Sequence, residues 1–399
     1  MPPVAAPIRR DLAIDAMKGA ACLLIVAHHL SVYSPMSDQA GALVPGAAGW
    51  LYDYGRWVVQ VFLVIGGYLA AASLAPHPGQ LLPTSRSAGS LIWRRYCRLV
   101  LPYGVAVLAS VLVAAVIRPW FVHPSVPHAP SLAQALAHAL LLQDVFGFEA
   151  LSAGLWYVAI DFQLYALSVL VFLAAAAAAR RWQGQALPRA DTVMLVIGAA
   201  SLLVFNRYTA LDVTAFYFVG AYMLGMLAYW AVPEPALTAD AAPRRLDRER
   251  LGLLVVFGVI ALAVAFRGRV ALAWAVALAL VVLRLRFQAP RRACDQAQRA
   301  PVWRRLADTS VRWLASVGVM SYSVFLIHFP VCLLVNAGMA AVWPLGAWPN
   351  ALGLVAAIAL SLTAGSVLYR WVEQAPAVRH RRKSYKAMRG SSNSEIQEK

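Results

Sequence analysis

Charged side chains are scarce in this sequence. Asp, Glu, Lys and Arg make up 13% of the 399 residues, whereas hydrophobic residues make up 61%. Soluble domains carry about 25% charged residues, which cover the surface that faces water. This composition excludes an ordinary soluble fold and predicts a chain that faces lipid over most of its area.

Acidic residues are fewer still, 18 against 35 Lys and Arg, so the formal net charge is +17. The basic residues fall in short clusters between apolar runs, as they do in the cytoplasmic loops of membrane proteins. No basic face is large enough to follow a phosphate backbone, so we expect no nucleic-acid partner. We expect the basic part of the C-terminal tail, which begins at Arg379, to contact anionic lipid headgroups.

Cysteines number only four, and none of them has a partner at metal-ligand spacing or in a disulfide pattern. We therefore expect no metal centre. Internal repeats are also lacking, which counts against a transporter built from inverted repeats.

Long apolar runs take up most of the chain. A helix needs about 20 apolar residues to cross the hydrocarbon core. The sequence predicts an all-α, polytopic membrane helix bundle over residues 1–376 and a basic, then polar, disordered tail over residues 377–399. The ten or so expected spans are 14–34, 57–75, 99–118, 154–179, 191–206, 213–232, 251–266, 270–287, 315–341 and 350–370.

The placement of the basic residues predicts the orientation of the bundle. With ten spans and a cytoplasmic N-terminus, the cytoplasmic segments hold 30 of the 35 Lys and Arg. Such an excess is typical of the cytoplasmic side, so we expect both termini there. The segment 131–146, on the other side, is moderately apolar and is expected to lie along the membrane surface.

The first span carries ionisable residues, which are costly inside a membrane and therefore mark candidate functional sites. Lys18 and His29 are eleven residues apart, so at about 100° per residue they share one helix face, about 16 Å apart along the axis. His28 points about 100° away. His29 is either a histidine satisfied by a neighbouring helix or a general base for an alcohol. Lys18 is either a snorkelling anchor or part of the same groove.

The second span contains Gly66 and Gly67, which predict close helix packing. Arg94, Arg95 and Arg98 follow it, and Arg95 and Arg98 share a face if this run is helical. These arginines are either an anchor at the inner membrane surface or a clamp for a phosphorylated ligand.

Polar residues also interrupt the later spans. Asp161 lies one turn before Tyr165 in the fourth span, and a carboxylate there needs a partner. The candidate partners are Arg207, Arg118 and His29. In the ninth span His328 is either a packing residue or a site residue. Glu373, after the tenth span, pairs most simply with an arginine at the inner surface.

Taken in order, these stretches resemble the motifs of acyltransferase family 3, whose members are bacterial membrane proteins that O-acylate sugars of cell-envelope and other glycans. The resemblance covers residues 12 to 376. Three positions depart from the usual motifs: Lys18 stands in place of Arg, Gly66 in place of Ser, and Asp161 in place of Glu. Lysine keeps the charge of arginine but loses its planar fork. The closing Glu-x-Pro pattern is loosened to Glu373 and Pro376. The matching positions include Asp15, Gly19, His29, Phe62, Gly67, Arg94, Arg95, Arg98, Trp156, Tyr165, Ser321, Tyr322 and His328.

The resemblance implies an O-acyltransferase, in the simplest case an O-acetyltransferase, that moves an acyl group from acyl-CoA to a glycan hydroxyl. It implies an inner-membrane enzyme of bacteria that keeps no cofactor bound, uses acyl-CoA as cosubstrate, and could need a partner protein to complete transfer. The implied catalytic residues are His29, Asp161 and Lys18. The residues implied to bind the donor are Lys18, Arg94, Arg95 and Arg98. The residues implied to contact substrate or support the site are Trp156, Tyr165, Tyr322, His328 and Glu373.

Two other functions stay open at this point. A proton-coupled transporter would also use intramembrane His and Asp residues. A non-catalytic scaffold would tolerate the departures at Lys18, Gly66 and Asp161.

Overall fold

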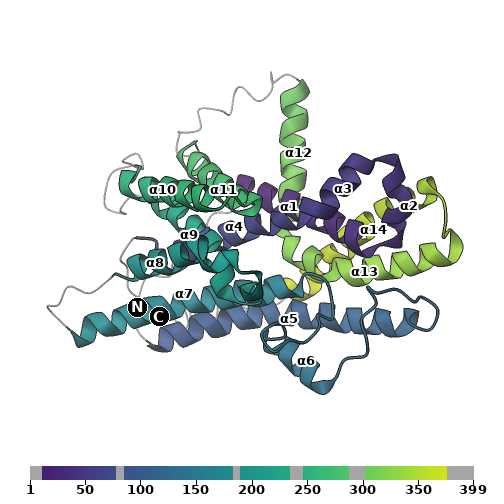
Figure 1. Cartoon of the computed structure of the whole chain (residues 1–399), viewed down its shortest axis with the longest axis horizontal. Helices are drawn as coiled ribbons and strands as arrows, with labels where there is room; N and C mark the ends of the chain where they lie inside the picture. Colours follow the sequence, from purple (N-terminus) through teal and green to yellow (C-terminus); the bar gives the residue numbers. More distant parts are fainter. Residues whose placement is uncertain (1–10, 78–84, 183–188, 234–245, 287–301, 375–399) are drawn as a thin grey trace, which may run out of the picture.

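The computed structural model describes residues 11–77, 85–182, 189–233, 246–286 and 302–374. All regular structure in these segments is helical, and they contain no strand (Figure 1). The all-α prediction is therefore confirmed for this part of the chain. The expected disordered tail, 377–399, lies outside the described residues.

Eight helices in the described segments are long and apolar enough to cross a membrane. The expected spans 213–232 and 251–266 correspond to helices of 16 and 17 residues, which are not among the eight. The eight candidates are Leu12–Tyr33, Pro45–Leu74, Ser87–Ile117, Leu155–Arg181, Ala190–Arg207, Gly268–Arg286, Ser321–Val342 and Ala347–Glu373.

The chain begins with a capped membrane helix and a helical connection. Helix α1 starts after Asp11, whose side chain accepts a 2.9 Å hydrogen bond from the Ala13 amide. Its apolar length makes it the first candidate span, as expected. The elements in this part are α1 (Leu12–Tyr33), α2 (Pro35–Ala40), η1 (Gly41–Leu43), α3 (Pro45–Tyr54), η2 (Gly55–Val58) and α4 (Val59–Leu74).

Two long helices, α5 (Ser85–Ile117) and α7 (Leu155–Arg181), pack side by side (Figure 1). Helix α5 has 33 residues and begins well before the expected span 99–118. The basic run Arg94–Arg98 is therefore helical, as the shared face of Arg95 and Arg98 required. Within the expected surface segment, α6 (Leu132–Ala139) forms a short helix with exposed leucines.

The middle of the bundle is filled by α9 (Ala215–Trp230), in which every residue except Phe216 is buried. It contacts α4, α7 and the other helices of this region. Such an all-round apolar helix is stabilised by packing on every side. Its neighbours are α8 (Ala190–Leu203), η3 (Phe205–Arg207), η4 (Thr209–Leu211), α10 (Arg248–Val264) and α11 (Gly268–Arg286).

The expected ninth span is wrong at its start. Residues 302–319 form a separate helix, α12 (Val302–Val319), and the chain turns at Met320 before α13 (Ser321–Val342). Helix α12 projects from the bundle (Figure 1). It packs on the first half of α1, where Cβ atoms at Gly19 and Gly318 would overlap the facing backbones. The chain continues through α14 (Ala347–Leu368) and the π-helical turn η6 (Tyr369–Glu373).

Candidate active site

A cavity of about 420 Å³ lies at the end of the bundle where α1 ends and α7 begins. This volume is within the range of small-molecule sites. The cavity combines aromatic walls with two histidines and one arginine, a lining suited to a polar ring. Its lining residues are Ile25, His28, His29, Val32, Tyr33, Tyr52, Arg56, Val59, Ala150, Ala153, Gly154, Trp156 and Phe325.

Gly154 shapes this cavity in two ways. Gly154 caps the start of α7 with a φ of +84°, a left-handed conformation that glycine adopts without strain. A Cβ at this position would lie 2.7 Å from the Phe325 ring, so a side chain is excluded for a second reason. The Phe325 ring can therefore pack against the N-terminus of α7 and line the cavity.

His29 and His328 form a hydrogen-bonded pair between α1 and α13. His29 Nδ1 lies 2.7 Å from His328 Nε2, and His328 Nδ1 lies 2.7 Å from the Phe325 carbonyl oxygen. A carbonyl oxygen only accepts, so His328 carries its proton on Nδ1 and accepts at Nε2. His29 must then donate from Nδ1, which leaves a lone pair on His29 Nε2. The chain of hydrogen bonds from the Phe325 carbonyl through His328 to His29 thus fixes His29 in the tautomer that a general base requires.

His28 lines the same cavity, although helix geometry turns it away from the His29 face. Its Nδ1 donates to the Leu51 carbonyl at 2.8 Å. Its ring centroid lies 5.5 Å from that of His29. Both histidines are mostly buried, at 7% and 8% exposed. The pairing with a second imidazole distinguishes His29, because that partner can stabilise an added proton through the Nδ1 hydrogen bond.

Trp156 and Arg56 also line this cavity and contact each other. The Arg56 guanidinium carbon lies 5.1 Å from the centroid of the Trp156 ring, a cation–π contact. Arg56 also lies 3.8 Å from Asp212 in a half-exposed ion pair. Trp156 was expected at a site from its motif. Arg56 was not, since the sequence shows it only as a basic residue outside the cytoplasmic segments.

Asp161 pairs with Arg95 at 2.5 Å, and the guanidinium carbon of Arg95 lies 5.2 Å from the centroid of the Tyr165 ring. The expectation that Asp161 pairs with Arg207, Arg118 or His29 is therefore wrong. The physical reason is that α5 extends to residue 85 and brings its basic run alongside α7. Arg118, for its part, donates to the Pro127 carbonyl at 2.8 Å.

The paired glycines of α4 bring α9 against this ion pair. A Cβ at Gly67 would overlap the Tyr222 carbonyl, so the helix backbones touch there. A Cβ at Gly66 would lie 3.3 Å from Asp161 Oδ1. The expected close packing is confirmed, and Gly66 stands directly beside the carboxylate.

The remaining basic residues gather toward the start of α1 and α5. Lys18 pairs with Asp15 at 2.6 Å and is not among the residues that line the cavity. Arg94 is exposed and donates to the Ser90 carbonyl, and Arg98 is exposed as well. Glu373 accepts from Ser323 at 2.7 Å, with Lys18 and Arg98 in electrostatic range, and makes no arginine ion pair within the described residues.

An aromatic layer separates these two polar regions. Phe62, Tyr157 and Phe325 come from α4, α7 and α13, with ring centroids 5.5–6.4 Å apart in each pair. Phe62 and Tyr157 lie one turn before Gly66 and Asp161, and Phe325 lies one turn before His328. Below the layer, Tyr322 donates to the Leu99 carbonyl at 2.8 Å. The site therefore has three levels: the histidine cavity, the aromatic layer, and the basic end with Asp161.

The chain matches one known protein family over almost its whole length. A family model described as an acyltransferase domain matches residues 11–370, which includes every candidate residue except Glu373. No curated protein and no solved structure matches the chain.

Proposed function

The chain belongs to acyltransferase family 3 and is a multi-pass membrane acyltransferase, and from this premise we propose that it transfers an acyl group from acyl-CoA to a glycan hydroxyl held in the His29 cavity. The observation that carries the proposal is the fixed tautomer of His29, whose Nε2 lone pair belongs to a residue of the cavity lining. The acceptor is a hydroxyl of a cell-envelope or exported glycan, and acetyl is the simplest acyl group.

His29 acts as the general base in this proposal. The acceptor hydroxyl gives its proton to His29 Nε2 while its oxygen attacks the carbonyl carbon of the thioester. The new C–O bond forms, the C–S bond breaks, and the proton returns from His29 to the leaving sulfur. His328 holds the imidazolium through the Nδ1 hydrogen bond during this step, so it is a positioning residue. General bases of this kind contribute about 10²–10⁴ in rate.

The donor enters at the basic end of the bundle. Lys18, Arg94 and Arg98 bind the phosphates of CoA there, because their charges are at least partly accessible. Arg95 is held by Asp161, so these two residues form the wall past which the pantetheine arm reaches the aromatic layer. Tyr165, Tyr322 and Glu373 support that end through their contacts.

The acceptor approaches from the opposite end. With both termini in the cytoplasm, as the basic residues indicate, α1 runs outward and the cavity faces the far side of the membrane. Helices α9 and α10 then complete a ten-helix bundle in the bacterial inner membrane. The pantetheine arm carries the thioester past the layer of Phe62, Tyr157 and Phe325, and the acyl group moves to the glycan hydroxyl at His29 in the outer half.

The test is turnover of radiolabelled acetyl-CoA by the purified full chain in liposomes, with cell-envelope glycan as acceptor. We expect His29→Ala to lower turnover by about 10² or more. His28→Ala is the matched control, since it removes the neighbouring imidazole of the same cavity and should leave most turnover. Equal turnover in the two variants would remove His29 from the mechanism.

A second pair of variants tests the tautomer itself. His328→Phe removes the acceptor for His29 Nδ1, whereas His328→Gln keeps a carbonyl oxygen that can accept. We expect kcat to fall about tenfold or more in His328→Phe, with the KM for acceptor nearly unchanged, and to recover partly in His328→Gln. A loss confined to KM would indicate that His328 only shapes the cavity.

A further inference from the structure

A second concave site lies away from the acyl-transfer levels, between α8 and α10. It is a groove of about 500 Å³. One wall is a single face of α8, formed by Thr192, Leu195, Val196 and Ala199, and the other is a face of α10 that includes Leu253 and Phe257. Both faces follow helical spacing, so the groove runs along the two helices for about 10 Å, or two turns.

The two ends of the groove differ in polarity. Arg189, Glu249 and Arg250 line the end where both helices begin, whereas the side chains farther along are apolar. Val196 is 64% exposed on this apolar wall. It belongs to α8, which together with η3 is long enough to cross the membrane. A groove with a charged mouth and an apolar body matches an amphiphile rather than a water-soluble ligand.

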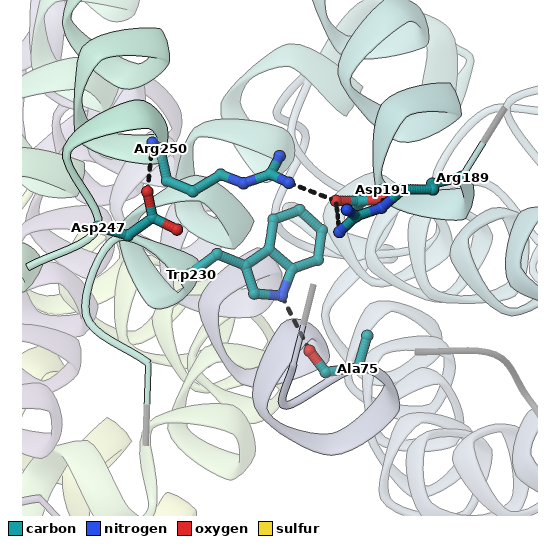
Figure 2. Close-up of polar contacts among 6 residues, drawn as sticks. All are labelled: Ala75, Arg189, Asp191, Trp230, Asp247 and Arg250. Carbon is teal, nitrogen blue, oxygen red and sulfur yellow. Dashed lines mark hydrogen bonds and ion pairs between the residues drawn. The ribbon is translucent and has the colours of Figure 1, made fainter. Parts of the chain in front are cut away.

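A set of hydrogen bonds and ion pairs holds the residues at the mouth (Figure 2). Arg250 is buried and donates to Asp191 Oδ2 at 2.7 Å. Asp247 caps α10 by accepting from the Arg250 amide at 3.1 Å, and its own amide donates to the Ala231 carbonyl at the end of α9. Nearby, Trp230 donates to the Ala75 carbonyl and ties α9 to the end of α4. The start of α10 is thus bonded to α8 and to the end of α9, and α9 is bonded in turn to the end of α4.

Two opposite charges remain exposed at this mouth. Arg189 donates twice to Asp191, at 3.1 Å each, but its side chain is 54% exposed. Glu249 is exposed in the first turn of α10. The buried Asp191 and Arg250 neutralise each other, so the accessible charges among the described residues that line the groove are one cation and one carboxylate. This pattern complements a zwitterionic headgroup, whose phosphate would meet Arg189 and whose ammonium would meet Glu249.

We propose that the α8–α10 groove is a binding site for one aminophospholipid of the phosphatidylethanolamine type. Its phosphate binds at Arg189 and Thr192, its primary ammonium binds at Glu249, and one acyl chain lies between Leu195, Val196, Ala199 and Phe257. The charge distribution of the chain puts this mouth at the cytoplasmic surface, where such a headgroup would lie. The site is separate from acyl transfer and does not depend on the function proposed above.

The test is native mass spectrometry of the full chain released from detergent. The protein is incubated with equimolar phosphatidylethanolamine, phosphatidylglycerol and phosphatidylcholine of matched acyl chains. We expect one retained phosphatidylethanolamine, favoured over phosphatidylglycerol by about fivefold, which corresponds to about 1 kcal/mol. Arg189→Ala should lower the bound phosphatidylethanolamine by a similar factor, and Glu249→Gln should abolish the preference over phosphatidylglycerol.

Arg248→Ala is the matched control, because Arg248 is exposed beside Glu249 but does not line the groove. Its lipid retention should equal that of the unsubstituted chain. Ala199→Phe fills the apolar body and should lower retention of all three lipids. Equal losses in Arg189→Ala and Arg248→Ala, or a preference for phosphatidylglycerol in the unsubstituted chain, would show only non-specific boundary lipid and overturn the proposal.

Discussion

Two buried aspartates in this chain form ion pairs with arginine, one with a single arginine and the other with two. Asp161 lies within α7 and accepts from Arg95, which comes from the neighbouring helix α5. Asp191 lies in the first turn of α8, has no exposed surface, and accepts from both Arg189 and Arg250. A carboxylate in the first turn is also stabilised by the helix dipole. Both Asp191 carboxylate oxygens therefore accept hydrogen bonds from arginine, as expected of a structural group.

Asp161 is less fully bound. Arg95 keeps a buried Nε that makes no hydrogen bond within the described residues, and its side chain is 29% exposed. Gly66 beside Asp161 offers no side chain in contact. Burial of an ion pair therefore does not by itself mark a functional site. Under the proposed function, the Asp161–Arg95 pair next to the aromatic layer is the one that a ligand would contact.

The largest expected effect is on folding, from Asp191→Ala. This change leaves the buried Arg250 without its carboxylate, and loss of one partner of a buried pair costs about 3–5 kcal/mol. We expect a marked fall in the midpoint of thermal unfolding in detergent. A midpoint like that of the unsubstituted chain would mean that Arg250 finds another acceptor and that the pair is not structural.

Asp161→Asn should affect catalysis more than folding. The amide oxygen can still accept a hydrogen bond from Arg95, so the fold should persist. The positive charge of Arg95 is then no longer balanced, which alters the environment of the acyl-CoA donor in the proposed function. We expect kcat/KM for acyl-CoA to fall by about 10-fold to 10²-fold, or about 1.4–2.7 kcal/mol. Asp191→Asn is the matched control and should lose stability while each folded molecule stays active. The reverse pattern would exchange the roles of the two aspartates.

Gly67→Ala tests the packing that brings α9 to Asp161. The added methyl group meets the Tyr222 carbonyl, which belongs to a helix backbone that has no room to move. Overpacking of this kind costs about 1–3 kcal/mol, so the unfolding midpoint should fall. Gly104→Ala, in a helix with open space around the site, should leave it unchanged or raise it slightly. Equal effects of the two substitutions would contradict a close α4–α9 contact.

The smallest effect on stability is expected from Arg189→Ala. Its guanidinium is more than half exposed, and exposed ion pairs contribute about 0–1 kcal/mol. Asp191 keeps Arg250, so the unfolding midpoint should shift little in the absence of added lipid. A fall as large as that of Asp191→Ala would show that Arg189 is part of the structural pair.

Several features followed from sequence pattern, and others did not. The apolar runs predicted most of the long helices, because helix formation in lipid depends on local composition. The break at Met320 was missed, because Gly318 before it lies within a continuous apolar run and was not distinguished from a glycine inside a helix. The separate direction of α12 depends on its packing against α1, which is non-local. The partner of Asp161 was missed because helix pairing is non-local, and apolar length alone did not reveal how far α5 extends. Arg56 carried no motif that could have identified it.

The sequence by itself determined a helical membrane protein and its family, because length, apolarity and ordered motifs are properties that each segment carries alone. It also marked His29 and His328 as polar residues in apolar helices. Only the tertiary structure brought these two rings to hydrogen-bond distance across 299 residues of chain. The proton position on His29 depends on that contact and on the Phe325 carbonyl, because a tautomer is fixed by neighbours in space rather than in sequence.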